Sequence, residues 1–289
     1  MSHNILLVVG KDGQLGQTLF QDLLFSGVKV IGTTHHQDKL NQDSFFLDLS
    51  YNPETWKIPN EITAAFICSS ITKLDLCKKD PIKTANVNVT GIYELTKKLV
   101  EKGVYVVVMS TGHVFDGTIP YHKPEDPYSP VDVYGIQKVE MEKKLKTLGD
   151  SVSIVRSARL LGPRMTRIIK WKKSLLKGEI IKPFSDYFLA PVPYPTLATL
   201  LQLIAQRQLS GIIQISGTRD ISYADAAYIG AKALKVNSDL VQPHTTTESG
   251  FKEHVFRNTR LDMSRLLDTF GFLPPEVEWT IEKAFTAAV

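Results

Sequence analysis

The chain has 289 residues, and at roughly 100 to 200 residues per domain this length allows one large α/β domain or a main domain with a smaller lobe. Hydrophobic residues make up 43% and charged residues 22%, a globular balance that excludes a disordered chain, a fibrous protein and a small disulfide scaffold. With 34 basic and 30 acidic residues the net charge is +4, which is too small to indicate nucleic-acid binding by itself.

The compartment is suggested by the cysteines and the N-terminus. Cys68 and Cys77 are too few for a disulfide framework or a zinc site. The short apolar run after Asn4 lacks the basic flank and cleavage site of a signal peptide, and no apolar run approaches the roughly 20 residues of a membrane span. We expect a cytoplasmic protein with no membrane or nucleic-acid partner.

In the first half, short β-branched apolar runs alternate with amphipathic stretches, a pattern typical of βαβ units and a parallel sheet. Leucines recur at helical spacing after the first strand, and Gly27 follows as a helix stop. Two further helices are predicted over residues 85–102 and 131–146. The predicted strands cover residues 5–9, 28–32, 45–47, 65–68, 104–110 and 153–156.

After Pro163 the alternation becomes irregular. Helical patterns occur near residues 167–176, 197–207, 223–234 and 277–287, and residues 212–215 form the one clear strand pattern there. We therefore predict an α/β fold with a Rossmann-type, doubly wound parallel sheet in residues 1–162. A smaller, mostly helical substrate lobe in residues 163–289 is expected to be partly interwoven with it.

A glycine-rich loop follows the first predicted strand directly. Gly10, Gly13 and Gly16 are each separated by two residues and open the first helix. Glycine lets backbone amides at a helix N-terminus approach a pyrophosphate closely, as a dinucleotide-binding crossover requires. Because the loop has a strand before it and a helix after it, a nucleotide cofactor is favoured over a plain tight turn. We expect the cofactor to contact the three glycines together with Asp12, Gln14 and Leu15.

The identity of the nicotinamide cofactor depends on the end of the second strand. An acid there would bind the ribose hydroxyls of NAD, but Thr33, Thr34 and His35 carry no carboxylate, and the next acid is Asp38. Hydroxyl and imidazole groups tolerate a 2′-phosphate, so NADP is favoured and NAD is the second option. A solvated loop whose histidines do nothing is an equally simple explanation.

Tyr134 and Lys138 are four residues apart, which places a phenol and an ammonium on one helix face. The strand over residues 104–110 ends just before Thr111, at the sheet edge where open α/β sheets bind ligands. A phenol can donate a proton to a carbonyl oxygen as hydride arrives, and an adjacent cation lowers the phenol's pKa. An ordinary surface pair is the alternative, and the glycine loop argues against it. The histidines show no metal-ligand spacing, so no metal is expected.

With these motifs the chain resembles the extended short-chain dehydrogenase/reductase family, and within it the dTDP-4-dehydrorhamnose reductases. The resemblance covers nearly the whole chain. Besides the glycine loop it is carried by Asp48-Leu49, the segments 88–91 and 110–117, Tyr134-Gly135 with Lys138 and Glu142, and the segments 258–262 and 271–272.

The resemblance implies that Thr111, Tyr134 and Lys138 form the catalytic triad and that Tyr134 and Lys138 also contact the cofactor. It further implies that a C-terminal lobe binds a nucleotide-diphosphate sugar, with Asn258 in its signature, and it is compatible with a homodimer. It places two further segments of the chain next to the cofactor, Asp48-Leu49 and Cys68-Ser69-Ser70.

Two departures fall on the substrate side. The family usually has Asp-Tyr where this chain has Gly112-His113, and a Trp where it reads Arg156-Ser157-Ala158-Arg159. His113 is a substrate contact or a packing residue, whereas Arg159 is expected to contact substrate. Basic residues concentrate over residues 156–177, where a diphosphate could use them. Gly112 cannot supply the acid that the family's 4,6-dehydratases place beside the catalytic threonine.

Three functions follow from these patterns. The first is an NAD(P)H-dependent reductase of a 4-keto nucleotide-sugar in which Tyr134 is the proton donor. The second is a non-catalytic, cofactor-binding regulatory subunit of the same fold, like the methionine adenosyltransferase regulatory subunit. The third is an NAD-dependent nucleotide-sugar epimerase, which shares the triad and cycles its cofactor.

Overall fold

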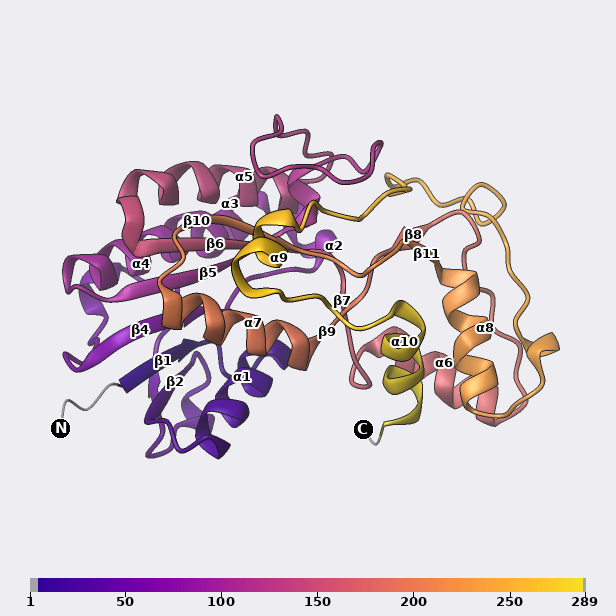
Figure 1. Cartoon of the computed structure of the whole chain (residues 1–289), viewed down its shortest axis with the longest axis horizontal. Helices are drawn as coiled ribbons and strands as arrows, with labels where there is room; N and C mark the ends of the chain where they lie inside the picture. The colour runs from indigo at the N-terminus through magenta and orange to yellow at the C-terminus, as the bar shows by residue number, and fades with distance from the viewer. Residues whose placement is uncertain (1–4, 288–289) are drawn as a thin grey trace. The chain divides into compact units, whose positions relative to one another are not determined.

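The first apolar run forms β1 (Ile5–Val9), an inner strand of a seven-stranded sheet whose order is β10-β6-β5-β4-β1-β2-β3 (Figure 1). The computed structural model describes residues 5–287. Parallel pairing joins β1 to both β2 and β4, β2 to β3, and β4 to β5. The remaining strands of this sheet are β2 (Val30–Thr34), β3 (Ser44–Phe46), β4 (Ile62–Ile67), β5 (Tyr105–Thr111), β6 (Val152–Ser157) and β10 (Gly211–Ile215).

The strand order reverses at β1, because β2 and β3 lie on one side of it and β4, β5 and β6 on the other. Open α/β sheets bind ligands outside the carboxyl ends of the strands at such a switch point. The predicted glycine loop follows β1 and therefore lies at this position. The fold is the predicted Rossmann-type α/β sheet.

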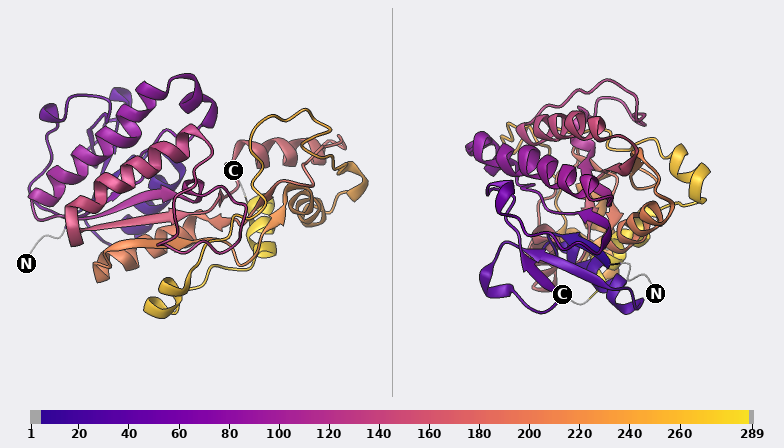
Figure 2. Two further views of the ribbon diagram at one scale, coloured as in Figure 1. Left: turned by 90° about the horizontal axis from the view of Figure 1, so that it is seen from above. Right: turned by 90° about the vertical axis from the view of Figure 1, so that its left-hand side faces the viewer.

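Helices cover both faces of the sheet. Figure 2 shows α4 and α5 along one face and α7 along the other. Beneath α4 and α5 lies one core cluster in which Leu7, Leu99 and Met141 are fully buried. Burying one such side chain contributes about 1.5–3 kcal/mol. The helices around the sheet are α1 (Gln14–Phe25), α2 (Leu74–Lys79), α3 (Pro81–Ala85), α4 (Ile92–Glu101), α5 (Val133–Leu145) and α7 (Tyr194–Arg207).

Short helical segments connect these elements. A π-helical segment, η3 (Asn86–Gly91), joins α3 to α4, so the helix predicted over residues 85–102 is π-helical before Ile92. The 3₁₀ segments are η1 (Gln37–Lys39), η2 (Pro53–Thr55), η4 (Gly112–Val114), η5 (Lys146–Ser151) and η6 (Ser238–Leu240).

The chain divides into two compact units. The first comprises residues 1–115, 128–156 and 197–213, and the second comprises residues 116–127, 157–196 and 214–289. Most of β10 and α7 therefore belong with the sheet, although both were expected in the C-terminal lobe. A division between residues 162 and 163 stays a prediction about domains.

The second unit has its own core, in which Leu175, Ala227 and Phe285 are almost completely buried. Its short strands pair as β7 with β9 in parallel and β8 with β11 in antiparallel fashion. Among residues 5–287, no helix is both long and apolar enough to span a bilayer. The elements of this unit are β7 (Leu160–Leu161), α6 (Thr166–Leu176), β8 (Phe188–Leu189), β9 (Val192–Pro193), β11 (Ile221–Ser222), α8 (Tyr223–Ala233), α9 (Ser264–Phe270) and α10 (Val277–Thr286).

Candidate active site

The glycine loop makes a tight turn between β1 and α1. Gly10 has a φ of +82°, and a Cβ on it would lie 2.9 Å from the Cβ of Ser69. A Cβ on Gly16 would lie only 2.2 Å from the carbonyl oxygen of Gly10. Both positions therefore require glycine, for conformation at the first and for close packing at the second.

The N-terminus of α1 suits an anionic group. Gly13 is its N-cap, and within the described chain no side chain caps this helix and its first turn carries no acid. The first amides of a helix have no partner inside the helix, and they carry the positive end of its dipole. Gly13 is exposed, so a pyrophosphate could approach these amides. The residues at this position fit the dinucleotide cofactor expected from the sequence.

The end of β2 is bound to the glycine loop by side-chain hydrogen bonds. The Gly10 amide donates to the Thr33 hydroxyl at 3.0 Å, and the Thr34 hydroxyl donates to Asp12 Oδ2 at 2.5 Å. Ligand atoms of Asp12, His35 and His36 all lie within 4.8 Å of one another, so these three groups could also hold a cation. The spacing of the histidines in the sequence did not indicate this cluster, because Asp12 belongs to another loop.

Asp48 and Leu49, which the family resemblance implies lie beside the cofactor, follow β3. The Asp48 carboxylate accepts from the amide and hydroxyl of Ser50, at 2.8 and 2.7 Å, so it shapes its own turn. A Cβ on Gly91 would lie 2.2 Å from the Leu49 carbonyl oxygen, which explains the glycine in η3. The two residues are therefore held in place by the turn and by η3.

The loop after β4 carries Cys68, Ser69 and Ser70. Asn88 holds this loop, because its Oδ1 accepts from the Ser70 hydroxyl and the Ile71 amide, each at 2.8 Å. Its Nδ2 donates to Gln137 on α5 at 2.9 Å. Burial raises the pKa of the Cys68 thiol to about 12, which keeps it protonated. Asn88 thus joins the predicted cofactor loop to the helix of Tyr134 and Lys138.

Thr111, Tyr134 and Lys138 lie in the same unit, the first at the end of β5 and the others on α5. All three are buried, with exposed fractions of 7%, 8% and 1%. The Thr111 hydroxyl accepts from the His113 amide at 3.2 Å, so its own proton can be donated elsewhere. Lys138 Nζ lies 5.9 Å from the centroid of the Tyr134 ring.

The Lys138 ammonium is held inside the unit. Its Nζ donates to the Met109 carbonyl oxygen at 3.0 Å. Burial lowers the pKa of Lys138 to about 8, although the Glu142 carboxylate acts in the opposite direction. At neutral pH the group is still charged, and a cation close to a phenol stabilises the phenolate.

His113 lies beside Tyr134, with their rings edge to face and their centroids 5.9 Å apart. Its Nδ1 is 2.7 Å from Asp132 Oδ2, and Asp132 Oδ1 accepts from the Gly135 amide at 2.7 Å as the N-cap of α5. A Cβ on Gly135 would lie 2.2 Å from the His113 carbonyl oxygen. Gly135 therefore allows the His113 turn to lie directly against the first turn of α5.

Arg159 belongs to the second unit, where it lies among tyrosines. The phenol of Tyr223 raises the pKa of the Arg159 guanidinium, and Tyr187 and Tyr194 add to this effect. Arg167 stacks over the Tyr223 ring at 4.3 Å. These aromatic and guanidinium groups can stack on a base or bind a diphosphate.

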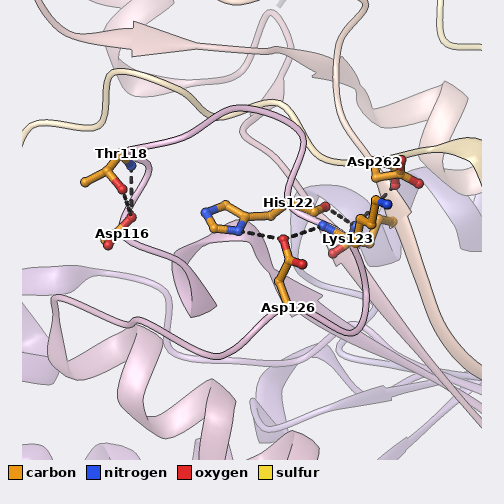
Figure 3. Close-up of polar contacts among 7 residues, drawn as sticks. Asp116, Thr118, His122, Lys123, Asp126 and Asp262 are labelled. Atoms are coloured by element: carbon orange, nitrogen blue, oxygen red, sulfur yellow. Dashed lines mark hydrogen bonds and ion pairs between the residues drawn. The ribbon is translucent and has the colours of Figure 1, made fainter.

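Asn258 is also in the second unit, and its side chain bonds the backbone. Its Nδ2 donates to the Thr118 carbonyl oxygen at 3.0 Å, and its amide donates to the Gly117 carbonyl oxygen. A few residues further along the chain, the Asp126 carboxylate accepts from His122 and from the Lys123 amide (Figure 3). Asn258 thus ties the segment 116–118 to the C-terminal signature, and substrate contact by Asn258 stays a prediction.

The family assignment comes from the whole sequence. The model of the RmlD substrate-binding domain matches residues 4–289. The chain belongs to the RmlD substrate-binding-domain family.

Curated relatives of this RmlD-family chain carry two kinds of name. A dTDP-4-dehydrorhamnose reductase from Aggregatibacter actinomycetemcomitans is 28% identical over 286 residues, which covers 94% of this chain and 95% of the relative. The methionine adenosyltransferase 2 subunit beta of Bos taurus is 24% identical and covers 71% of this chain and 64% of the relative.

Solved structures share the fold of the RmlD-family chain. A dTDP-4-dehydrorhamnose reductase from Bacillus anthracis in complex with NADP superposes with a TM-score of 0.84 at 21% identity, covering 99% of each chain. A UDP-glucose 4-epimerase from Thermotoga maritima with UDP-glucose gives 0.79 at 18% identity, covering 98% of this chain and 97% of the epimerase.

Two buried residues of this RmlD-family chain were not among the site residues predicted from the sequence. Asn88 and Glu142 stood only in family motifs, yet both are fully buried and contact elements of the candidate site. Their place in those motifs was the signal available in the sequence. Arg156, which was counted among the diphosphate-binding cations, is fully buried against Glu142, so that expectation is corrected.

Proposed function

We propose that the chain is an NADP-preferring reductase that converts a 4-keto nucleotide-sugar into the corresponding alcohol. The arrangement of Thr111, Tyr134 and Lys138 in the same unit as the glycine loop carries this proposal. Similarity to dTDP-4-dehydrorhamnose reductases along almost the full length supports the substrate class. When bound, NADPH supplies the hydride.

Thr111 orients the carbonyl group. Its hydroxyl oxygen already accepts from the His113 amide, so its proton is available to a second partner. Donation to the carbonyl oxygen polarises the carbon that is reduced. Tyr134 donates its phenolic proton to the same oxygen as the negative charge develops there.

Lys138 supports Tyr134 electrostatically. Its ammonium is fixed by the Met109 carbonyl oxygen and lies within 6 Å of the centre of the phenol ring, at 5.9 Å. Because the site is buried, this cation stabilises the phenolate more strongly than it would in water. Uptake of one proton from solvent then restores the neutral phenol of Tyr134.

The decisive experiment measures NADPH oxidation with dTDP-4-keto-6-deoxy sugars in single-turnover and steady-state modes. In Tyr134→Phe we expect the chemical step to slow by about 10²–10⁴-fold, the usual contribution of a positioned acid. Tyr93→Phe, on α4 of the same unit, is the matched control and should keep the wild-type rate. An unchanged rate in Tyr134→Phe would overturn the mechanism.

A regulatory subunit is the second candidate, because methionine adenosyltransferase 2 subunit beta chains are also relatives. The altered substrate-side residues Gly112, His113 and Arg159 favour this alternative, and the intact triad opposes it. Tight NADPH binding without oxidation by any sugar nucleotide would establish it. Co-purified NAD that persists through dialysis, with interconversion of sugar epimers, would instead indicate the epimerase.

A further inference from the structure

The end of β2 has no acid of its own, but the glycine loop supplies one. Asp12 is exposed, and its Oδ2 accepts from the Thr34 hydroxyl at 2.5 Å. Thr34 is almost fully buried at 1% exposure, so it fixes the carboxylate at the last residue of β2. This is the place where Rossmann folds that use NAD carry the acid for the ribose hydroxyls.

Two imidazoles meet this carboxylate. His35 and His36 follow Thr34 directly, and their ring centroids are 3.9 Å apart. The His36 amide donates to the Thr34 hydroxyl at 3.0 Å, so the same threonine orients the turn and the carboxylate. A hydrogen-bond acceptor with negative charge and two potential donors therefore converge within 4.8 Å.

These groups favour different cofactors. The 2′- and 3′-hydroxyls of NAD donate hydrogen bonds, which a carboxylate accepts well. The 2′-phosphate of NADP is repelled by a carboxylate and bound by imidazole N–H groups. We propose that Asp12 is the acceptor for the adenosine ribose of NAD, and that His35 and His36 are the donors for the 2′-phosphate of NADP. The balance between them sets the relative affinity for the two cofactors.

Lys11 adds a positive charge on the same loop. Its ammonium donates to Asn41 Oδ1 at 3.2 Å, and its methylene groups cross Gly32, where a Cβ would lie 2.2 Å from Lys11 Cδ. Its place is therefore set by contacts outside the cluster. It contributes a constant attraction for phosphate, whereas Asp12, His35 and His36 discriminate between the cofactors.

The inference rests on the proposed function only in requiring a nicotinamide dinucleotide, and binding can test it without turnover. Dissociation constants of NADP and NAD are measured calorimetrically on the cofactor-free protein, at neutral pH and low salt. EDTA is included because the cluster could also hold a cation. Asp12→Asn keeps an oxygen acceptor for Thr34 and removes only the charge.

We expect Asp12→Asn to tighten NADP and weaken NAD, changing the ratio of their dissociation constants by about tenfold, the equivalent of roughly 1.4 kcal/mol. His35→Gln and His36→Gln should weaken NADP several-fold and leave NAD within twofold. Asp38→Asn, which removes the same charge from the neighbouring η1, is the control and should leave the ratio unchanged.

An unchanged ratio in Asp12→Asn, or an equal loss of both cofactors, would overturn the assignment of Asp12. NADP binding with the expected ratio change but no sugar reduction would overturn the proposed function alone. If the wild-type chain binds neither dinucleotide at millimolar concentration, both proposals fail.

Discussion

The carboxylate of Glu142 on α5 and the guanidinium of Arg156 on β6 form an ion pair at 2.8 Å, and neither side chain is exposed to solvent. Glu142 also accepts from the Ser110 hydroxyl at 2.5 Å and from the Tyr128 hydroxyl at 2.9 Å. Since Ser110 precedes Thr111 and α5 carries Tyr134, this one carboxylate links both sides of the proposed triad.

Breaking this pair from one side should destabilise the protein strongly. Glu142→Gln leaves the Arg156 charge buried without its counterion, and such changes cost about 3–5 kcal/mol. Urea unfolding of the cofactor-free protein measures the loss. Glu140→Gln, exposed on the same helix, is the control and should change stability by less than about 0.5 kcal/mol.

The double variant Glu142→Gln with Arg156→Met provides the second test of the pair. The double variant has no uncompensated charge in the core. Its loss of stability should therefore be clearly smaller than the sum of the losses in the two single variants. Additive losses would contradict a direct interaction between the two side chains.

The buried Lys138 ammonium should lower the free energy of unfolding, although the proposed reaction requires it. Burial lowers its pKa to about 8 in the folded protein, against an ordinary value of about 10.4 in the unfolded chain. Between these values the unfolded chain binds more protons, so stability should rise with pH through this window. In Lys138→Met that rise should disappear, and at pH 7 the variant should gain on the order of 1–2 kcal/mol after loss of the Met109 hydrogen bond.

Measurements of reductase activity distinguish the loss of the Lys138 charge from a change in packing alone. Lys138→Met should lose nearly all reductase activity at every pH, while Lys138→Arg retains a charge that does not titrate. A Lys138→Met protein that is less stable than wild type at pH 7, with the same dependence on pH, would refute the assignment.

The parts of the fold with strong periodicity were predictable. The strand at residues 5–9 was predicted with the observed bounds, and the glycine loop was placed correctly between β1 and α1. Hydrophobic periodicity identifies elements but not the sheet neighbours of a late strand, so the strand pattern at residues 212–215 did not indicate that β10 is an edge strand of the main sheet. In η3, Gly91 packs against Leu49 of a distant segment, and no local pattern encodes this contact.

The site was predictable where its residues are close in sequence. Tyr134 and Lys138 were found because four residues make one helical turn. Other contacts of the site join residues that are far apart in the sequence. The separation is 22 positions for Asp12 with Thr34, 49 for Asn88 with Gln137 and 19 for His113 with Asp132. Such pairs form only when the sheet brings separate loops together, and a single sequence contains no signal for them.

Asp132 should couple the His113 turn to the start of α5. Asp132→Ala removes the N-cap hydrogen bond to Gly135, a loss of about 1–2 kcal/mol at pH 7, whereas Asp132→Asn keeps a capping oxygen and should lose less. Thermal unfolding of the two variants beside wild type measures the difference. Equal losses would show that the cap does not contribute.

The contribution of Asp132 should also depend on pH. Burial acts to raise the pKa of its carboxyl, but hydrogen bonds from His113 and from the Gly135 and Tyr134 amides outweigh burial and leave the pKa below its ordinary value. A depressed carboxyl pKa contributes stability above the unfolded value of about 3.9, and this contribution is lost as pH falls through the folded value. The gap between wild type and Asp132→Ala should therefore be constant near neutrality and shrink below about pH 4.

Two glycines of the cofactor loop should respond differently to alanine. In Gly16→Ala the new methyl group would lie 2.2 Å from the Gly10 carbonyl oxygen, a backbone atom that cannot move without distorting the loop. We expect a loss of about 1–3 kcal/mol in urea unfolding and a large loss of NADP affinity. Gly13 has a φ of −73°, and its nearest contact would be at 3.4 Å, so Gly13→Ala should change stability by less than about 1 kcal/mol, because the poorer N-capping by alanine and the reduced freedom of the unfolded chain act in opposite directions. Its methyl group would instead obstruct the exposed approach to the α1 amides, so Gly13→Ala should weaken NADP binding alone. Equal stability losses in the two variants would contradict this account of the loop.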